Sequence, residues 1–164
     1  MTVTLRQAGR EDVGDLLRLI RDLARYEQAE EQVTTDEAQL AATLFSDDAT
    51  AHAMVAEQGG RIVGLAIYFF NYSTWQGRNG LYLEDLFVEP QARGAGVGKA
   101  LLAKLAALAV DSDCGRFEWS VLDWNTPAME FYQSLGAQPQ AEWVRYRLDG
   151  EALKALKALA SIAG

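Results

Sequence analysis

Hydrophobic and polar positions along this chain follow two different periods. In residues 13–26 apolar side chains recur at i, i+3, i+4 and i+7, which predicts an amphipathic helix ending near Tyr26-Glu27. Residues 61–70 are apolar nearly throughout, as expected for a central strand buried on both faces. They follow residues 51–57 through Gln58-Gly59-Gly60, so the two runs predict a β-hairpin.

Further elements are marked by helix caps and by alternation. Thr34 stands three residues before Glu37, a capping-box pattern that predicts a helix to about Phe45. Thr126-Pro127 predicts a cap at Thr126 and a proline at the first helical position of a helix through Leu135 that Gly136 ends. The remaining predicted elements are strands at residues 3–7, 81–88, 117–121 and 143–148, and helices at residues 98–110 and 151–162.

The predicted order, β-α-α-β-β-β-α-β-α-β-α, mixes hairpins with β-α-β crossovers. It indicates an α+β fold with a mixed, mostly antiparallel central sheet, a parallel pair in the middle and flanking helices, and not a doubly wound sheet. No internal repeat or low-complexity linker interrupts the 164 residues. We therefore expect a single domain over residues 1–164.

The composition is that of an ordinary globular protein, with 49% hydrophobic residues and a net charge of −8. The acidity argues against a nucleic-acid partner and permits a cationic substrate, although it also fits a role in solubility alone. No apolar run approaches the roughly 20 residues of a membrane span, and the first residues lack a signal-peptide pattern. Cys114 is the only cysteine, which suits a reducing cytoplasm.

The glycine-rich turn from Arg93 to Lys99 joins a predicted strand to a predicted helix. Glycines leave backbone N–H groups free to approach a phosphate, and the helix N-terminus favours the same anion. A Rossmann fingerprint would need glycine at Lys99, counted as the sixth position from Gly94. A Walker A loop would need glycine at Arg93 and serine or threonine at Ala100, so neither motif is present.

A second block follows downstream, where Trp124-Asn125 precedes a predicted helix that carries Phe131-Tyr132 and ends at Gly136. Together with Arg-x-x-Gly-x-Gly at residues 93–98, this block resembles the GNAT superfamily of acetyl-CoA-dependent N-acetyltransferases. The chain is most similar to its diamine/polyamine (spermidine/spermine) and thialysine acetyltransferase branch. The segments that carry this closer resemblance are residues 23–27, residues 31–33, Trp75-x-Gly77, residues 81–88 and Trp124-Asn125.

The resemblance implies direct acetyl transfer from acetyl-CoA to a small cationic amine, without a metal, in a cytoplasmic homodimer. In the family the backbone before the turn binds the pantetheine arm, and the turn holds the pyrophosphate beside the parallel strand pair. The implied acetyl-CoA-binding residues are Leu86, Phe87, Val88, Arg93, Gly94, Ala95, Gly96, Val97, Gly98, Lys99, Asn125, Ala128, Phe131 and Tyr132.

The chemistry of amine acetylation needs a proton acceptor and a proton donor. An alkylammonium has a pKa of about 10.4, so only about one molecule in 2,500 is a neutral nucleophile at pH 7. By resemblance Glu84 accepts the amine's proton through water, and Tyr132 donates a proton to the leaving thiolate. The residues expected to bind the acceptor amine are Tyr26, Glu27, Trp75, Glu84, Asp85 and Trp143.

Several alternatives stay open at this point. Glu84 and Asp85 are adjacent, so both line one site only if the strand bulges, and Asp85 is equally suited to an ion pair or a turn cap. Trp75 and Trp143 fit a hydrophobic core as well as a cation site. Two other functions also remain, a protein or peptide N-acetyltransferase and a non-catalytic acyl-CoA-binding module.

Overall fold

The structure is a computed structural model that describes residues 2–162. The chain forms two compact units, Met1–Leu122 and Asp123–Gly164, and each is described by itself. The elements of the first unit are β1 (Val3–Gln7), α1 (Val13–Tyr26), α2 (Glu37–Leu44), β2 (His52–Gln58), β3 (Arg61–Ser73), β4 (Arg78–Val88), α3 (Val97–Asp111) and β5 (Phe117–Trp119), with short 3₁₀ turns at Arg10–Asp12, Glu30–Gln32 and Pro90–Ala92. The second unit contains α4 (Thr126–Ser134), α5 (Gly150–Lys157) and the 3₁₀ helix Ala158–Ile162.

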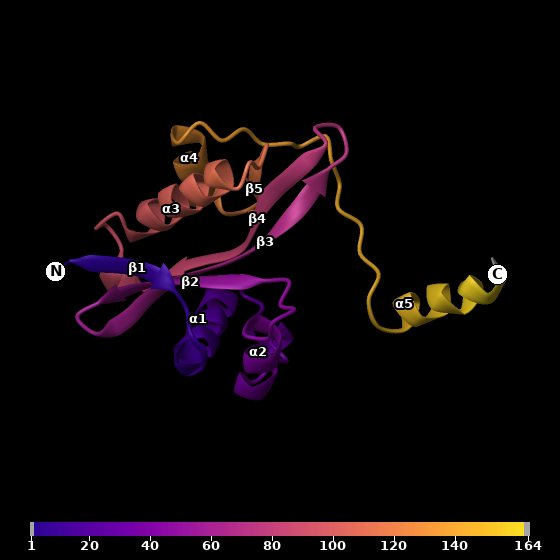
Figure 1. Ribbon diagram of the computed structural model, residues 1–164, viewed down its shortest axis with the longest axis horizontal. Coiled ribbons are helices and arrows are strands. Elements are labelled where there is room, and N and C mark those ends of the chain that lie inside the picture. Colours follow the sequence, from indigo (N-terminus) through magenta and orange to yellow (C-terminus); the bar gives the residue numbers. More distant parts are fainter. Residues whose placement is uncertain (1, 163–164) are drawn as a thin grey trace. The chain divides into compact units, whose positions relative to one another are not determined.

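The strands of the first unit form one sheet in the order β1-β2-β3-β4-β5. Neighbouring strands are antiparallel except for β4 and β5, which are parallel. Helices α1 and α2 lie on one side of this sheet and α3 lies on the other (Figure 1). The mixed, mostly antiparallel sheet predicted from the sequence is therefore confirmed.

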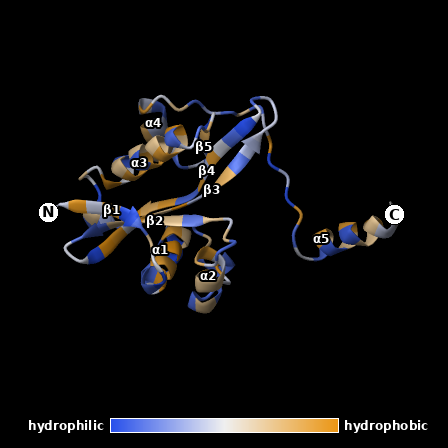
Figure 2. Cartoon of the chain, in the orientation of Figure 1, coloured by the Kyte–Doolittle hydropathy of each residue, from blue (hydrophilic) through white to orange (hydrophobic). Residues whose placement is uncertain are grey.

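The core of the first unit lies on both faces of the sheet. On one face Leu16 and Leu19 of α1 pack with strand residues that include Leu65 and Phe87, and both leucines are fully buried. On α3, Leu105 is likewise fully buried. Figure 2 shows hydrophobic stretches in the central strands, where these two helices pack. No helix within residues 2–162 is long and apolar enough to cross a membrane.

Most predicted boundaries agree with the structure to within a few residues. The hairpin turn between β2 and β3 is confirmed, with Gly59 and Gly60 both at positive φ as a two-residue turn requires. The predicted capping box is wrong: Asp36, and not Thr34, caps α2, because the Asp36 side chain accepts a hydrogen bond from the backbone N–H of Gln39 at 2.8 Å.

The strand predicted at residues 143–148 is also wrong, since these residues form no strand. Their apolar alternation satisfies the pattern of a strand, but a strand also needs a neighbour that pairs with its backbone. In the described part of the second unit there is no strand to supply one, and residues 141–150 are exposed throughout. The parallel pair predicted for the middle of the sheet consequently lies at its edge, with β5 last.

Helix α3 offers a direct test of the packing. Leu105→Ala should lower the free energy of unfolding by about 2–5 kcal/mol, because the substitution removes a fully buried side chain and leaves a cavity. Val110→Ala is the matched control on the same helix, since Val110 is 75% exposed and its truncation should cost less than about 0.5 kcal/mol. Urea unfolding of both variants checks this, and equal losses would contradict the assigned core.

Candidate functional site

An irregularity in β4 sets the position of two acidic residues. Tyr68 of β3 pairs with Leu83, but the next residue, Ile67, pairs with Asp85, so Glu84 is an extra residue without a partner on β3. This is a β-bulge, and the bulge expected for the two carboxylates to share one site is therefore present. Asp85 pairs with Ile67, which belongs to the core cluster under α1, so Asp85 lies on the α1 face of the sheet.

Two neighbouring carboxylates act on Asp85 at this bulge. The pKa of Asp85 is raised to about 6, mainly by burial and further by the negative charges of Glu84 and Glu27. Burial also raises the pKa of Glu27, which follows the last residue of α1. The end of α1 and the bulge of β4 thus form an acidic group that a cation would stabilise in its ionised state.

The turn after β4 has the backbone geometry expected of an anion-binding loop. Gly94 and Gly96 have φ values of 84° and 80°, a left-handed conformation that other residues rarely adopt. Gly96 is the N-cap of α3, and no side chain of the described residues caps that helix. Its first N–H groups are therefore available to an anion, and nothing lies within 4 Å of where a Cβ on either glycine would be.

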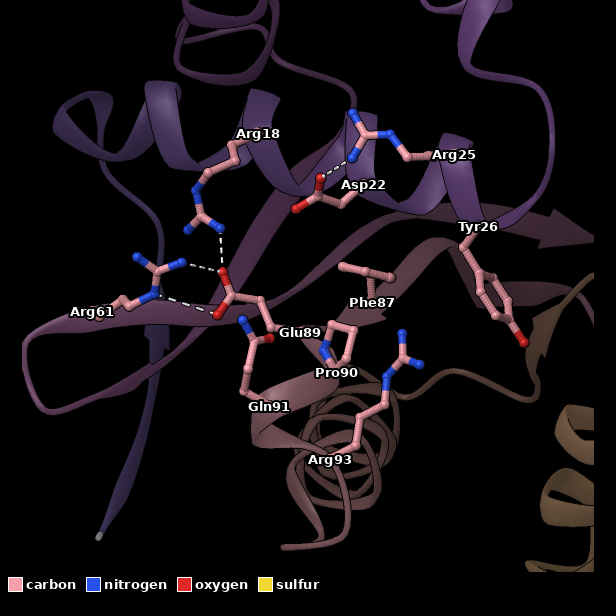
Figure 3. Close-up of a pocket in the computed structure, with 10 residues that line it drawn as sticks. All are labelled: Arg18, Asp22, Arg25, Tyr26, Arg61, Phe87, Glu89, Pro90, Gln91 and Arg93. Carbon is pink, nitrogen blue, oxygen red and sulfur yellow. Dashed lines mark hydrogen bonds and ion pairs between the residues drawn. The ribbon is translucent and has the colours of Figure 1, made fainter.

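A pocket of about 590 Å³ lies between α1 and the end of β4, directly before this turn (Figure 3). Its lining includes four arginines, Arg18, Arg25, Arg61 and Arg93. Arg93 Nε donates a hydrogen bond to the carbonyl of Val88 at 2.9 Å. Its guanidinium lies 5.5 Å from the ring centroid of Tyr26 and 5.3 Å from that of Phe87, both within cation–π distance.

Glu89 at the end of β4 is a buried carboxylate that sequence reasoning did not identify. Arg18 Nη1 and Arg61 Nη2 both donate to Glu89 Oε1, the latter at 2.7 Å. Burial alone would raise the pKa of Glu89, but these two arginines outweigh it and lower the pKa below its ordinary value. The two ion pairs of Glu89 therefore connect Arg18 of α1 and Arg61 of β3 to the end of β4. The sequence does indicate that Arg18, Asp22 and Arg25 share one face of a helix, because they are spaced at i, i+4 and i+7. Nothing in the sequence indicates that Glu89 pairs with a residue on that face.

The other predicted site residues lie further from this group or in the second unit. Trp75 is 84% exposed in the β3–β4 turn. The turn starts six residues along β3 from the Ile67–Asp85 pair, roughly 20 Å at about 3.3 Å per residue. Trp143 is 70% exposed in the extended segment of the second unit. Their roles in acceptor binding stay predictions.

The second predicted motif begins α4 in the second unit. Asn125, and not the predicted Thr126, is the N-cap of α4, because the Asn125 Oδ1 accepts a hydrogen bond from the N–H of Ala128 at 3.4 Å. Thr126 is instead the first residue of the helix, and Pro127 is the second. The rings of Phe131 and Tyr132 are 5.8 Å apart on the same helix. Gly136 has φ 95° directly after the helix, as its predicted role in ending the helix requires. The helix that carries Phe131 and Tyr132 and its end at Gly136 are as predicted, whereas the cap is not. The functional roles of these residues remain predictions.

Asp85→Asn should change how the stability of the protein depends on pH. The folded-state pKa of about 6 lies above the ordinary value of 3.8, so the folded protein loses stability as pH rises between about 4 and 6. Asparagine does not ionise, so the variant should gain up to about 3 kcal/mol relative to the unsubstituted protein across that interval. Urea unfolding at several pH values from about 4 to 7 measures this gain.

The matched control is Asp48→Asn, because Asp48 is an exposed aspartate of the same unit. Its stability curve should run parallel to that of the unsubstituted protein. If both asparagine variants show the same pH dependence, the raised pKa of Asp85 is contradicted.

Comparison with known proteins agrees with this geometry. Residues 16–137 match the model of the acetyltransferase (GNAT) family. A thialysine N-epsilon-acetyltransferase from Bos taurus is 43% identical over 165 residues, which span 94% of this chain and 96% of the bovine protein. An L-ornithine N5-acetyltransferase from Arabidopsis thaliana is 42% identical over 98 residues, which span 60% of this chain and 43% of that protein.

A solved structure has the same fold over nearly the whole chain. An integron cassette protein from the mobile metagenome of V. cholerae superposes with a TM-score of 0.81 and 29% sequence identity, covering 96% of this chain and 98% of its own. The family model covers most of the chain and the bovine relative covers almost all of it, so the protein belongs to the GNAT family of acetyltransferases.

Proposed function

We propose that this protein transfers the acetyl group of acetyl-CoA directly to a terminal primary amine of a small, multiply charged cation. The acceptor class is a diamine, a polyamine or a basic amino acid resembling thialysine. Relatives named for thialysine and for ornithine both act on amino acids that end in a primary amine. A homodimer remains a prediction from the family resemblance, and a cytoplasmic location remains a prediction from the single cysteine, Cys114.

The observation that carries this proposal is the acidic group at the β4 bulge. Asp85 is mostly shielded from water, and this burial, followed by the negative charges of Glu84 and Glu27, raises its pKa. No arginine or lysine of the described residues lies within ion-pair distance of these three carboxylates. A cationic ligand would offset these negative charges, so the group suits an alkylammonium.

Acetyl-CoA is the donor that GNAT acetyltransferases use, and it supplies an acetyl thioester. Two features of this chain suit acetyl-CoA: the left-handed conformation of Gly94 and Gly96, and the N-terminus of α3, which no side chain of the described residues caps. Both would hold the pyrophosphate of acetyl-CoA. The backbone of residues 86–88 would bind its pantetheine arm. The N–H of Leu86 is a candidate to polarise the thioester carbonyl.

Proton transfer is assigned to two residues by the family motif. Glu84 is exposed at the bulge and would accept the proton of the amine through water. Asp85 and Glu27 would hold the distal ammonium of the acceptor. Tyr132 would donate a proton to the leaving sulfur, because a phenol with a pKa near 10 is a suitable acid for a thiolate.

A panel of amines tests the proposed activity. The purified protein with acetyl-CoA should release free thiol with thialysine, ornithine, spermidine or 1,4-diaminobutane, and mass spectrometry should show an acetylated amine. A protein that acetylates only lysine peptides would contradict the small-molecule acceptor. Coenzyme A binding without turnover on any amine would favour a non-catalytic binding module.

Asp85→Asn sharpens this test by separating the two ends of the acceptor. The KM for 1,4-diaminobutane should rise about 10- to 100-fold, because the variant loses a charge-assisted hydrogen bond to the distal ammonium. Butylamine is the matched acceptor that lacks this ammonium, so its KM should change much less. Equal changes for both amines would remove Asp85 from distal-ammonium binding.

Tyr132→Phe should lower kcat by about 100-fold or more, the size expected for loss of a general acid. The dissociation constant for coenzyme A should stay within about threefold of the unsubstituted value, since the ring remains. Tyr146→Phe is the control in the same unit, because Tyr146 is 93% exposed and its hydroxyl has no proposed role. A parallel loss of turnover and coenzyme A affinity would exclude Tyr132 as the general acid.

A further inference from the structure

Arg93 occupies a position that joins two parts of the proposed site. It is the residue directly before Gly94, where the anion-binding turn begins. Its guanidinium lies against the ring of Tyr26, the last residue of α1, and against the ring of Phe87 on β4 (Figure 3). One side chain therefore links the proposed donor turn to the helix end that carries the proposed acceptor residues.

The charge of Arg93 differs from that of the other arginines around the pocket. Arg18 and Arg61 are paired with Glu89, and Arg25 is paired with Asp22 and Glu30. Within residues 2–162 no carboxylate lies within ion-pair distance of Arg93. Its contacts are instead the Val88 carbonyl and the two aromatic rings, so its positive charge is free to respond to an anion at the turn.

The aromatic contact fixes the end of α1. Tyr26 is 44% exposed, and Glu27 follows it at the C-cap, where helices fray most readily. A planar guanidinium 5.5 Å from the Tyr26 ring centroid limits that freedom. Because Glu27 is the next residue, the stack also limits where its carboxylate lies relative to Asp85.

The geometry points to Arg93 as a positioning residue that couples the donor site to the acceptor site through Tyr26. This inference rests on the proposed function and deepens it, because it predicts that an occupied donor turn strengthens amine binding. An anion at the turn attracts the guanidinium and orders it. The ordered guanidinium in turn holds Tyr26 and Glu27 in the arrangement that receives the acceptor.

Calorimetric titration of thialysine, with and without saturating coenzyme A, tests this coupling without turnover. Coenzyme A should tighten thialysine binding about 2- to 5-fold in the unsubstituted protein, the range expected for one exposed cation–π contact. Linkage requires thialysine to tighten coenzyme A binding by the same factor. Tyr26→Leu should abolish the enhancement, whereas Tyr26→Phe should retain it because the aromatic face remains.

Arg93→Lys keeps the charge but removes both the planar stack and the Nε hydrogen bond, so it should also abolish the enhancement. The double variant Tyr26→Leu/Arg93→Lys should bind thialysine no more weakly than whichever single variant has the lower affinity. Both substitutions remove the same contact, the one between Arg93 and Tyr26, so their effects should not add. Arg21→Lys is the matched control, because Arg21 is an exposed residue of α1 that does not line the pocket. It should leave the enhancement unchanged.

The outcomes separate this inference from the proposed function. Thiol release with thialysine but the same thialysine affinity with and without coenzyme A overturns the coupling alone. Full enhancement in Tyr26→Leu, or effects of Tyr26→Leu and Arg93→Lys that multiply, also overturns it. A protein that neither binds thialysine nor acetylates any amine overturns both.

Discussion

The extra residue in β4 is the constraint on which the rest of the site depends. Side chains alternate between the faces of a strand, so inserting one residue exchanges the faces of all that follow. With Glu84 as the inserted residue, Asp85 and Phe87 lie on the face covered by α1, and Leu86 and Val88 lie on the opposite face. A regular β4 would place Phe87 away from α1. Arg93 would then lose one of its two aromatic contacts and Asp85 its proximity to Glu27.

Charge is compensated in different ways at two positions along this strand segment, Asp85 and Glu89. Asp85 and Glu89 are both shielded carboxylates on β4 or at its end, yet the pKa of the first is raised and that of the second is lowered. Two arginines account for the low value at Glu89, and two neighbouring carboxylates contribute to the high value at Asp85. In the first arrangement the carboxylate is paired with two arginines, which ties α1 and β3 to the end of β4. In the second, no arginine or lysine of residues 2–162 lies within ion-pair distance, as is suitable for a site that binds a cation.

The parts of this protein that were predictable from sequence are those determined by local pattern. Helix α1 follows from its apolar period, the β2–β3 turn from Gly59-Gly60, and the left-handed turn before α3 from Gly94 and Gly96. The bulge was expected only from family resemblance, because two adjacent acids do not by themselves report a change of register. The pairing of Arg18 with Glu89 spans 71 residues and depends on how α1 lies on the sheet. Such long-range contacts have no local signature, and the same reason explains why alternation at residues 143–148 was misleading.

Arginine suits position 93 because one side chain makes a hydrogen bond through Nε and also contacts two aromatic rings through its guanidinium. Its backbone lies in an extended conformation at the entrance to the turn, and Nε is used locally to hold the side chain on the Val88 carbonyl. The guanidinium carbon lies 5.5 Å from the ring centroid of Tyr26 and 5.3 Å from that of Phe87. Lysine has a single charged nitrogen on a flexible stem, so it would have to choose among these partners. The planar group instead contacts the strand and α1 at the same time, and it keeps donors for a phosphate. The Arg93 side chain is thus the proposed route by which occupancy of the turn reaches the acidic group at the bulge.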